Sequence, residues 1–128
     1  MVLGDWMSAI TLILEDGEDV VKSIAKFARQ EKINYGMIIS GKGAIREFEV
    51  ISHGSRGAME KFSNPREFEV NAISGKIEKR DGAMEVKVKV LMSSSGFTPL
   101  SGELLKGKTA GRLEIGITKI DMKKMITA

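Results

Sequence analysis

The sequence contains no cysteine, a single histidine, two prolines, one tryptophan and one tyrosine. Without cysteine the chain forms no disulfide and offers no thiolate as nucleophile or metal ligand. One histidine, His53, leaves few ways to build a transition-metal site within one subunit. The longest apolar run near the N-terminus, Ala9 to Leu14, is too short to cross a bilayer, and no basic region precedes it as a secretion signal requires. We therefore expect a cytoplasmic protein that contacts no membrane.

What the chain does contain is the composition of an ordinary globular domain. Its 128 residues are 42% hydrophobic and 29% charged, which is enough to bury a core of its own. A net charge of +3 and a pI near 9.2 permit a polyanion such as nucleic acid as a partner without demonstrating one. The positive excess is small because acids and bases alternate through most of the sequence.

One long helix is predicted, from about Glu18 to Lys32. Acidic residues near its start suit the helix dipole, and Asp16 is the expected cap. Apolar residues recur along one stripe, as in a helix that packs on a core. They are Val20, Val21, Ile24, Phe27 and Ala28.

The rest of the chain has the pattern of strands joined by turns. Ile10–Leu14 is predicted to be a strand buried largely on both faces, and Ser40–Gly43 a break between two strands. The segment His53–Asn64 has no clear period and is predicted to be a loop. A bulge is expected near Ala72, and Arg80-Asp81-Gly82 has the composition of a tight hairpin turn. One helix and six or seven strands indicate an α+β domain, with an antiparallel or mixed sheet flanked by at least one long helix.

Four motifs in this order resemble the plants and prokaryotes conserved (PPC) domain. They are Leu14–Val20 (LEDGEDV), Ile39–Ile45 (ISGKGAI), Phe68–Gly75 (FEVNAISG) and Ser101–Gly107 (SGELLKG). The resemblance covers residues 8–122, which we take as the domain, with 1–7 and 123–128 as terminal extensions. It implies a sheet flanked by helices, a homotrimer and a stand-alone prokaryotic member. Plant members carry AT-hook motifs before this domain, and prokaryotic members are commonly labelled predicted DNA-binding proteins by analogy.

The resemblance also draws attention to Lys87, Lys89 and Glu103. Many bacterial and archaeal relatives carry histidines at the corresponding positions, which look like a metal site. A protonated lysine has no free lone pair, so we expect the metal site to be lost and no cofactor to be bound. Instead, we expect Glu103 to approach Lys87 or Lys89 as an ion pair. Two other interpretations stay open: a small-anion-binding or vestigial metalloenzyme-like site, and lysines that only keep a solvent-facing strand soluble.

Basic residues accumulate toward the C-terminus and are the candidate nucleic-acid contacts. They are Lys106, Lys108, Arg112, Lys119, Lys123 and Lys124. Aromatic residues are too few for stacking on single strands, and no Arg-Gly-Arg-Pro hook is present, so only non-specific phosphate contacts are predicted. Together with the resemblance, this predicts a non-enzymatic DNA-associated or protein-assembly domain whose partners are its own copies, DNA and other proteins.

Overall fold

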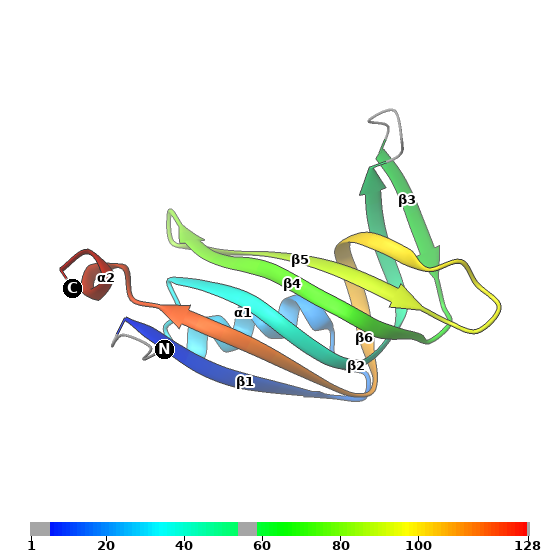
Figure 1. The fold of residues 1–128 in the computed structure, drawn as a ribbon, viewed down its shortest axis with the longest axis horizontal. Helices are drawn as coiled ribbons and strands as arrows, with labels where there is room; N and C mark the ends of the chain where they lie inside the picture. The colour runs from blue at the N-terminus through cyan, green and yellow to red at the C-terminus, as the bar shows by residue number, and fades with distance from the viewer. Residues whose placement is uncertain (1–5, 54–58, 128) are drawn as a thin grey trace.

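The computed structural model describes residues 6–53 and 59–127, which consist mainly of long antiparallel strands (Figure 1). The elements follow in the order β1 (Met7–Glu15), α1 (Val20–Gln30), β2 (Tyr35–His53), β3 (Met59–Asn64), β4 (Phe68–Arg80), β5 (Ala83–Ser93), β6 (Leu100–Ile120) and α2 (Met122–Thr127). No helix within these two ranges is long and apolar enough to cross a membrane.

The six strands form one antiparallel sheet that curls back on itself. β6 pairs with β1, β2 and β5, and β2 also pairs with β3 and β4. Because β4 in turn pairs with β5, the strands β6, β2, β4 and β5 complete a ring of paired neighbours. β2 and β6 are long strands that each pair with more than one partner of this ring. Bulges interrupt the pairing between β2 and β6 where these strands bend.

The hydrophobic core lies between the curled sheet and α1. This helix packs against β1, β5 and β6 and buries Val20, Ile24 and Ala28, so the stripe predicted from the sequence is confirmed. Phe48 of β2 and Phe68 of β4 are buried in the same core, with their rings edge to face at a centroid distance of 5.0 Å. Among the described elements, only α1 packs closely against the sheet.

The predicted fold class is wrong, because the structure is mostly antiparallel sheet with two short helices and no long flanking one. α1 has 11 residues and does not span Glu18 to Lys32. Its N-cap is Asp19 and not Asp16: the Asp19 side chain accepts a hydrogen bond from the backbone N–H of Lys22 at 2.8 Å. Apolar periodicity identified the helix, but the caps decide where it begins and ends.

The C-terminal end of α1 has a left-handed residue that is not glycine. Lys32 has a φ of 54°, its N–H donates to the carbonyl of Arg29 at 3.3 Å, and the N–H of Ile33 donates to the carbonyl of Ala28 at 2.8 Å. This is the Schellman motif, whose left-handed position is usually glycine. A side chain in that conformation costs roughly 1–2 kcal/mol. The chain therefore holds a lysine where glycine is less strained.

Three local predictions about strands can be compared with the structure. The register change expected near Ala72 is confirmed, because the pairing of β4 with β5 shifts between Val70 and Ala72. The hairpin turn is confirmed as well, since Asp81 and Gly82 have φ values of 50° and 80°, both positive as a primed turn requires. The expectation that β1 is buried on both faces is wrong: Ile13 is 41% exposed on the side away from the core.

Two segments predicted as irregular are extended in the structure. Of His53–Asn64, the part from Met59 forms β3 and pairs with β2, His53 ends β2, and residues 54–58 lie outside the described residues. Ser40–Gly43 does not end a strand, because β2 continues through it, but the register shifts on either side agree with the bend or bulge that its two glycines predict. Both corrections have one reason: pairing with a neighbouring strand keeps a polar or glycine-rich segment extended, and local periodicity does not show that.

Candidate functional site

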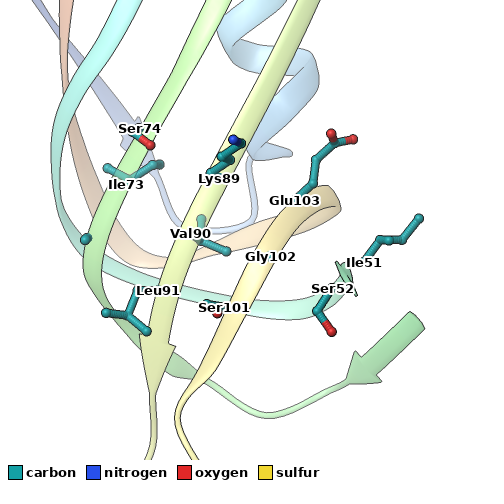
Figure 2. A pocket seen from close by; sticks show the side chains of 11 residues that line it. Ile51, Ser52, Ile73, Ser74, Lys89, Val90, Leu91, Ser101, Gly102 and Glu103 are labelled. Atoms are coloured by element: carbon teal, nitrogen blue, oxygen red, sulfur yellow. The ribbon is translucent and has the colours of Figure 1, made fainter. Parts of the chain in front are cut away.

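A pocket of about 520 Å³ opens on the face of the sheet turned away from the core, where β2, β4, β5 and β6 meet. Two rows of paired residues cross it. One row runs through Ser74, Lys89, Glu103 and Ile51, and the other through Ala72, Leu91 and Ser101. Figure 2 shows Lys89 and Glu103 at one end of the pocket, with Leu91 and Ser101 toward the other. The pocket therefore combines charged, hydroxyl and aliphatic groups from four strands.

The glycine between Ser101 and Glu103 is required by a close approach of β6 to β2. A Cβ atom at Gly102 would lie 2.4 Å from the carbonyl oxygen of Ile51 and 2.7 Å from Cγ1 of Val50. No real side chain fits at these distances. Gly102 thus allows β6 to lie against β2, and this contact places Glu103 next to both β5 and β2.

Lys89 and Glu103 are direct cross-strand neighbours in the pairing of β5 with β6. Their side chains project from adjacent strands on the same side of the sheet (Figure 2). No nitrogen–oxygen distance between them is 4.0 Å or less, and neither side chain forms an ion pair or hydrogen bond with another residue of the described ranges. The strand register places the two groups together, and the ion pair itself stays a prediction.

Lys87 lies apart from this pocket. It is paired with Lys76 across β4 and β5 and lines a separate hollow of about 90 Å³. In that hollow Glu78 binds Lys76 at 2.9 Å and Arg80 at 3.3 Å. The larger pocket therefore contains only one of the two lysines that the sequence singled out.

The pocket residues do not fit a metal ion. A protonated lysine offers no lone pair, and Glu103 is the one carboxylate among the described residues that line the pocket. In the described part of the chain, no group of three or more histidine, aspartate or glutamate residues lies close enough together to hold a metal ion.

The six basic residues predicted to contact nucleic acid do not form one patch. They are spread along the 21 residues of β6 and onto α2, where Lys123 and Lys124 lie. Three of them bind carboxylates: Lys106 binds Glu49 at 3.0 Å, Lys108 binds Glu47 at 3.5 Å, and Arg112 binds Glu114 at 3.6 Å. Lys119, near the end of β6, donates to the carbonyl of Glu31 at 2.9 Å. A neighbouring carboxylate reduces the positive potential that a lysine offers to phosphate.

The sequence analysis missed a second basic site, at the C-terminal end of α1. A hollow of about 460 Å³ between this helix and the turn that joins β4 to β5 is lined by Arg29, Lys32 and Lys79, and by no acidic residue of the described ranges. None of the three cations forms an ion pair within 4.0 Å with any residue that the structure describes. Lys79 comes from β4, far along the chain, so no local pattern groups it with Arg29 and Lys32. We call these three residues the basic hollow.

The clearest pKa shift near the predicted basic residues is that of Glu49. Its carboxylate lies between Lys61 of β3, at 2.5 Å, and Lys106 of β6, at 3.0 Å. Hydrogen bonds, first from Lys61 and then from Lys106, lower the pKa of Glu49 from its ordinary value of 4.5. Two cations that would otherwise face phosphate are thus held by one carboxylate.

This arrangement predicts a pH dependence of stability. The folded protein keeps Glu49 ionised at a pH where the unfolded chain already protonates it. The contribution of Glu49 to the free energy of unfolding is therefore complete above pH 4.5 and is lost as the pH falls through the lowered pKa. We expect the free energy of unfolding of Glu49→Gln to fall less steeply with acidification below pH 4.5 than that of the wild type. Urea unfolding followed by circular dichroism at a series of pH values measures this. Glu67→Gln, which removes an exposed carboxylate that binds no described cation, is the matched control. Identical curves for Glu49→Gln and the wild type would contradict the assignment.

Comparison with known proteins gives a family and a shared fold. The family model described as the Plants and Prokaryotes Conserved (PCC) domain matches residues 2–121. Similar solved structures include a metal-containing protein from Archaeoglobus fulgidus, at 21% identity and a TM-score of 0.77, with 89% of this chain and 80% of that chain covered. A plant- and prokaryote-conserved (PPC) protein from Pyrococcus horikoshii has 17% identity and a TM-score of 0.78, with 94% and 85% covered. A provisionally assigned DNA-binding protein from Bacteroides thetaiotaomicron has 18% identity and a TM-score of 0.75, with 92% and 86% covered. No curated protein matches the sequence at a significant level.

Proposed function

Since the chain belongs to the Plants and Prokaryotes Conserved domain family, abbreviated PCC or PPC, we propose that it is a non-enzymatic assembly domain that associates with DNA through the phosphate backbone. We propose further that it acts in the cytoplasm as a homotrimer and that the metal site of its relatives is lost. The observation that carries the DNA association is the basic hollow, in which three cations lie together without a carboxylate partner among the described residues.

The basic hollow supports phosphate binding in two ways. Contacts from lysine and arginine to phosphates supply most of the affinity of non-specific DNA binding, and Arg29, Lys32 and Lys79 are all exposed. In addition, Lys32 occupies a left-handed position where glycine is less strained. Backbone strain of this kind is concentrated at functional sites. The provisional DNA-binding assignment of the structurally similar Bacteroides thetaiotaomicron protein agrees with this proposal.

An exposed apolar area on the outer face of the sheet supports self-association. Met37 and Ile39 of β2 are 46% and 58% exposed there. Met37 pairs with Thr118 of β6 on one side and with Lys76 of β4 on the other, and Gly116 of β6 pairs with Thr11 of β1. The neighbours toward β6 and β1 are therefore small and uncharged. We call Met37, Ile39 and these three neighbours the bare face. Exposed apolar area on a folded domain is typical of a protein–protein interface, and the family resemblance implies three copies.

The loss of the metal site is supported by the chemistry of the side chains. Lys87 and Lys89 stand where many relatives carry histidines, and neither ammonium group has a lone pair to give. The structure also separates the two lysines between different hollows. A metal analysis of the purified protein that finds stoichiometric tightly bound zinc would contradict this part of the proposal.

The DNA association is tested with a triple variant, Arg29→Gln with Lys32→Gly and Lys79→Gln. Fluorescence anisotropy with a labelled duplex of random sequence gives the dissociation constant over a series of salt concentrations. We expect weaker binding, and a slope of log affinity against log salt that becomes shallower by about 0.9 for each phosphate contact removed. Lys32→Gly alone should weaken binding while leaving the fold at least as stable, because it relieves the left-handed lysine.

The matched control is Lys106→Gln with Lys108→Gln, which removes two cations that are bound to Glu49 and Glu47. We expect this double variant to keep most of the affinity and most of the salt slope. A wild-type protein that does not bind the duplex at low salt would overturn the DNA association. If the control variant lost as much of the salt slope for each lysine removed as the triple variant loses for each cation removed, the basic hollow would not be the site of DNA contact.

A further inference from the structure

The pocket formed by β2, β4, β5 and β6 contains one cation and one carboxylate, Lys89 and Glu103, and each lacks a partner among the described residues. Lys87, which would have made the site positive, lines a different hollow. A simple anion such as inorganic phosphate would be attracted by Lys89 and repelled by Glu103 beside it. A ligand that carries a positive and a negative group satisfies both side chains at once.

The two charged groups are not in contact with each other. Lys89 and Glu103 are direct neighbours across paired strands, yet their charged atoms are more than 4.0 Å apart. In Figure 2 their side chains extend from adjacent strands and leave a gap between their charged ends. A molecule whose ammonium and carboxylate are attached to one carbon atom can contact both groups there.

The rest of the pocket supplies hydroxyl and aliphatic groups. Ser74 pairs with Lys89 on one side, and Ser101 and Ser52 line the pocket from β6 and β2. Each hydroxyl can donate and accept a hydrogen bond. Leu91, which is 41% exposed, and Ile51 provide aliphatic surface. The volume of about 520 Å³ is within the range of roughly 300–1,000 Å³ that is usual for small-molecule sites.

We propose that this pocket binds a small zwitterion, namely an α-amino acid with an aliphatic side chain. Its carboxylate contacts Lys89, its ammonium contacts Glu103, and its side chain lies toward Leu91. The hydroxyl of Ser74, which pairs with Lys89, can complete the hydrogen bonds of the ligand's charged groups. Binding of the amino acid does not depend on DNA association or on the homotrimer, so each of these three proposals can be refuted without the other two.

Isothermal titration calorimetry with L-leucine, isocaproate, isoamylamine and inorganic phosphate tests the ligand class. Isocaproate is leucine without the ammonium group, and isoamylamine is leucine without the carboxylate. We expect L-leucine to bind and each of the other three to bind at least about tenfold more weakly, since each loses one charge-assisted contact. Isocaproate or phosphate binding as tightly as L-leucine would overturn the proposal, as would the absence of binding by L-alanine, L-valine and L-leucine at millimolar concentrations.

Variants test whether the two charged residues are the contacts. We expect Lys89→Gln and Glu103→Gln each to weaken L-leucine binding by about tenfold or more. Lys89→Gln should also reduce the preference for L-leucine over isoamylamine, a change that general damage to the fold would not produce. Lys87→Gln is the control, because this lysine is two residues away on the same strand but outside the pocket. Equal loss of affinity in Lys87→Gln and Lys89→Gln would overturn the assignment.

Discussion

Replacing Phe48 by alanine is expected to lower the free energy of unfolding by about 3–5 kcal/mol, the usual cost of truncating a buried phenylalanine. Phe48 is 1% exposed on β2, close to where this strand pairs with both β3 and β6. Its ring packs edge to face on Phe68 of β4 at 5.0 Å. Removing the ring leaves a cavity between strands that belong to the same closed ring of pairings, so the site has little freedom to collapse.

The matched control is Phe62→Ala. Phe62 lies on β3, 6.4 Å from the ring of Phe48, but is 39% exposed. Its truncation leaves less of a cavity, so we expect a clearly smaller loss. Urea unfolding of all variants at one protein concentration measures both changes, because self-association would otherwise alter the apparent stability. Equal losses of unfolding free energy in Phe48→Ala and Phe62→Ala would contradict the buried packing of Phe48 that the structure indicates.

Introducing glutamates at the bare face is expected to dissociate the proposed homotrimer into single chains. The variant is Met37→Glu with Ile39→Glu, at positions where both side chains are exposed in one chain; Lys76 of β4 pairs with Met37, whereas no described strand residue pairs with Ile39. Burying an unpaired carboxylate in an interface costs several kcal/mol per ion, and Ile39→Glu brings at least one to each copy. Light scattering after size-exclusion chromatography should give three times 14.0 kDa for the wild type and 14.0 kDa for the variant.

Ile126→Glu is the control for this experiment. Ile126 is 76% exposed on α2 and is not one of the bare-face residues, so the change adds a similar charge at an apolar position outside the proposed interface. We expect this variant to keep the mass of the wild type. A wild-type protein of 14.0 kDa, or a double glutamate variant that keeps the mass of three chains, would contradict assembly through the bare face.

The parts of the fold that could be predicted are those with a local cause. The stripe of α1 follows from helical periodicity, the turn at Asp81 and Gly82 from the backbone angles that these residues accept, and the bulge near Ala72 from a change in strand parity. The order of four motifs was enough to indicate the family, which the match over residues 2–121 confirms. The fold class was missed because it depends on how far each strand extends, and partner strands decide that.

The candidate sites show the same division. The resemblance of the sequence to the family singled out Lys87, Lys89 and Glu103 together, but strand register leaves Lys89 beside Glu103 and places Lys87 next to Lys76. Counting charges along β6 suggested a basic patch, whereas carboxylates from β2 bind two of those lysines. The basic hollow could not be predicted, because Lys79 meets Arg29 and Lys32 only when β4 passes the end of α1.

By itself, the sequence determined the composition, the absence of thiol chemistry, the buried stripe of α1 and the turn geometry, because each depends on residues a few positions apart. The tertiary structure alone decided which charges have partners, where β6 lies against β2 at Gly102, and which face of the sheet stays bare. These features depend on pairings between residues distant in the chain. Such pairings are set by how the whole sheet closes around its core, and no local pattern records them.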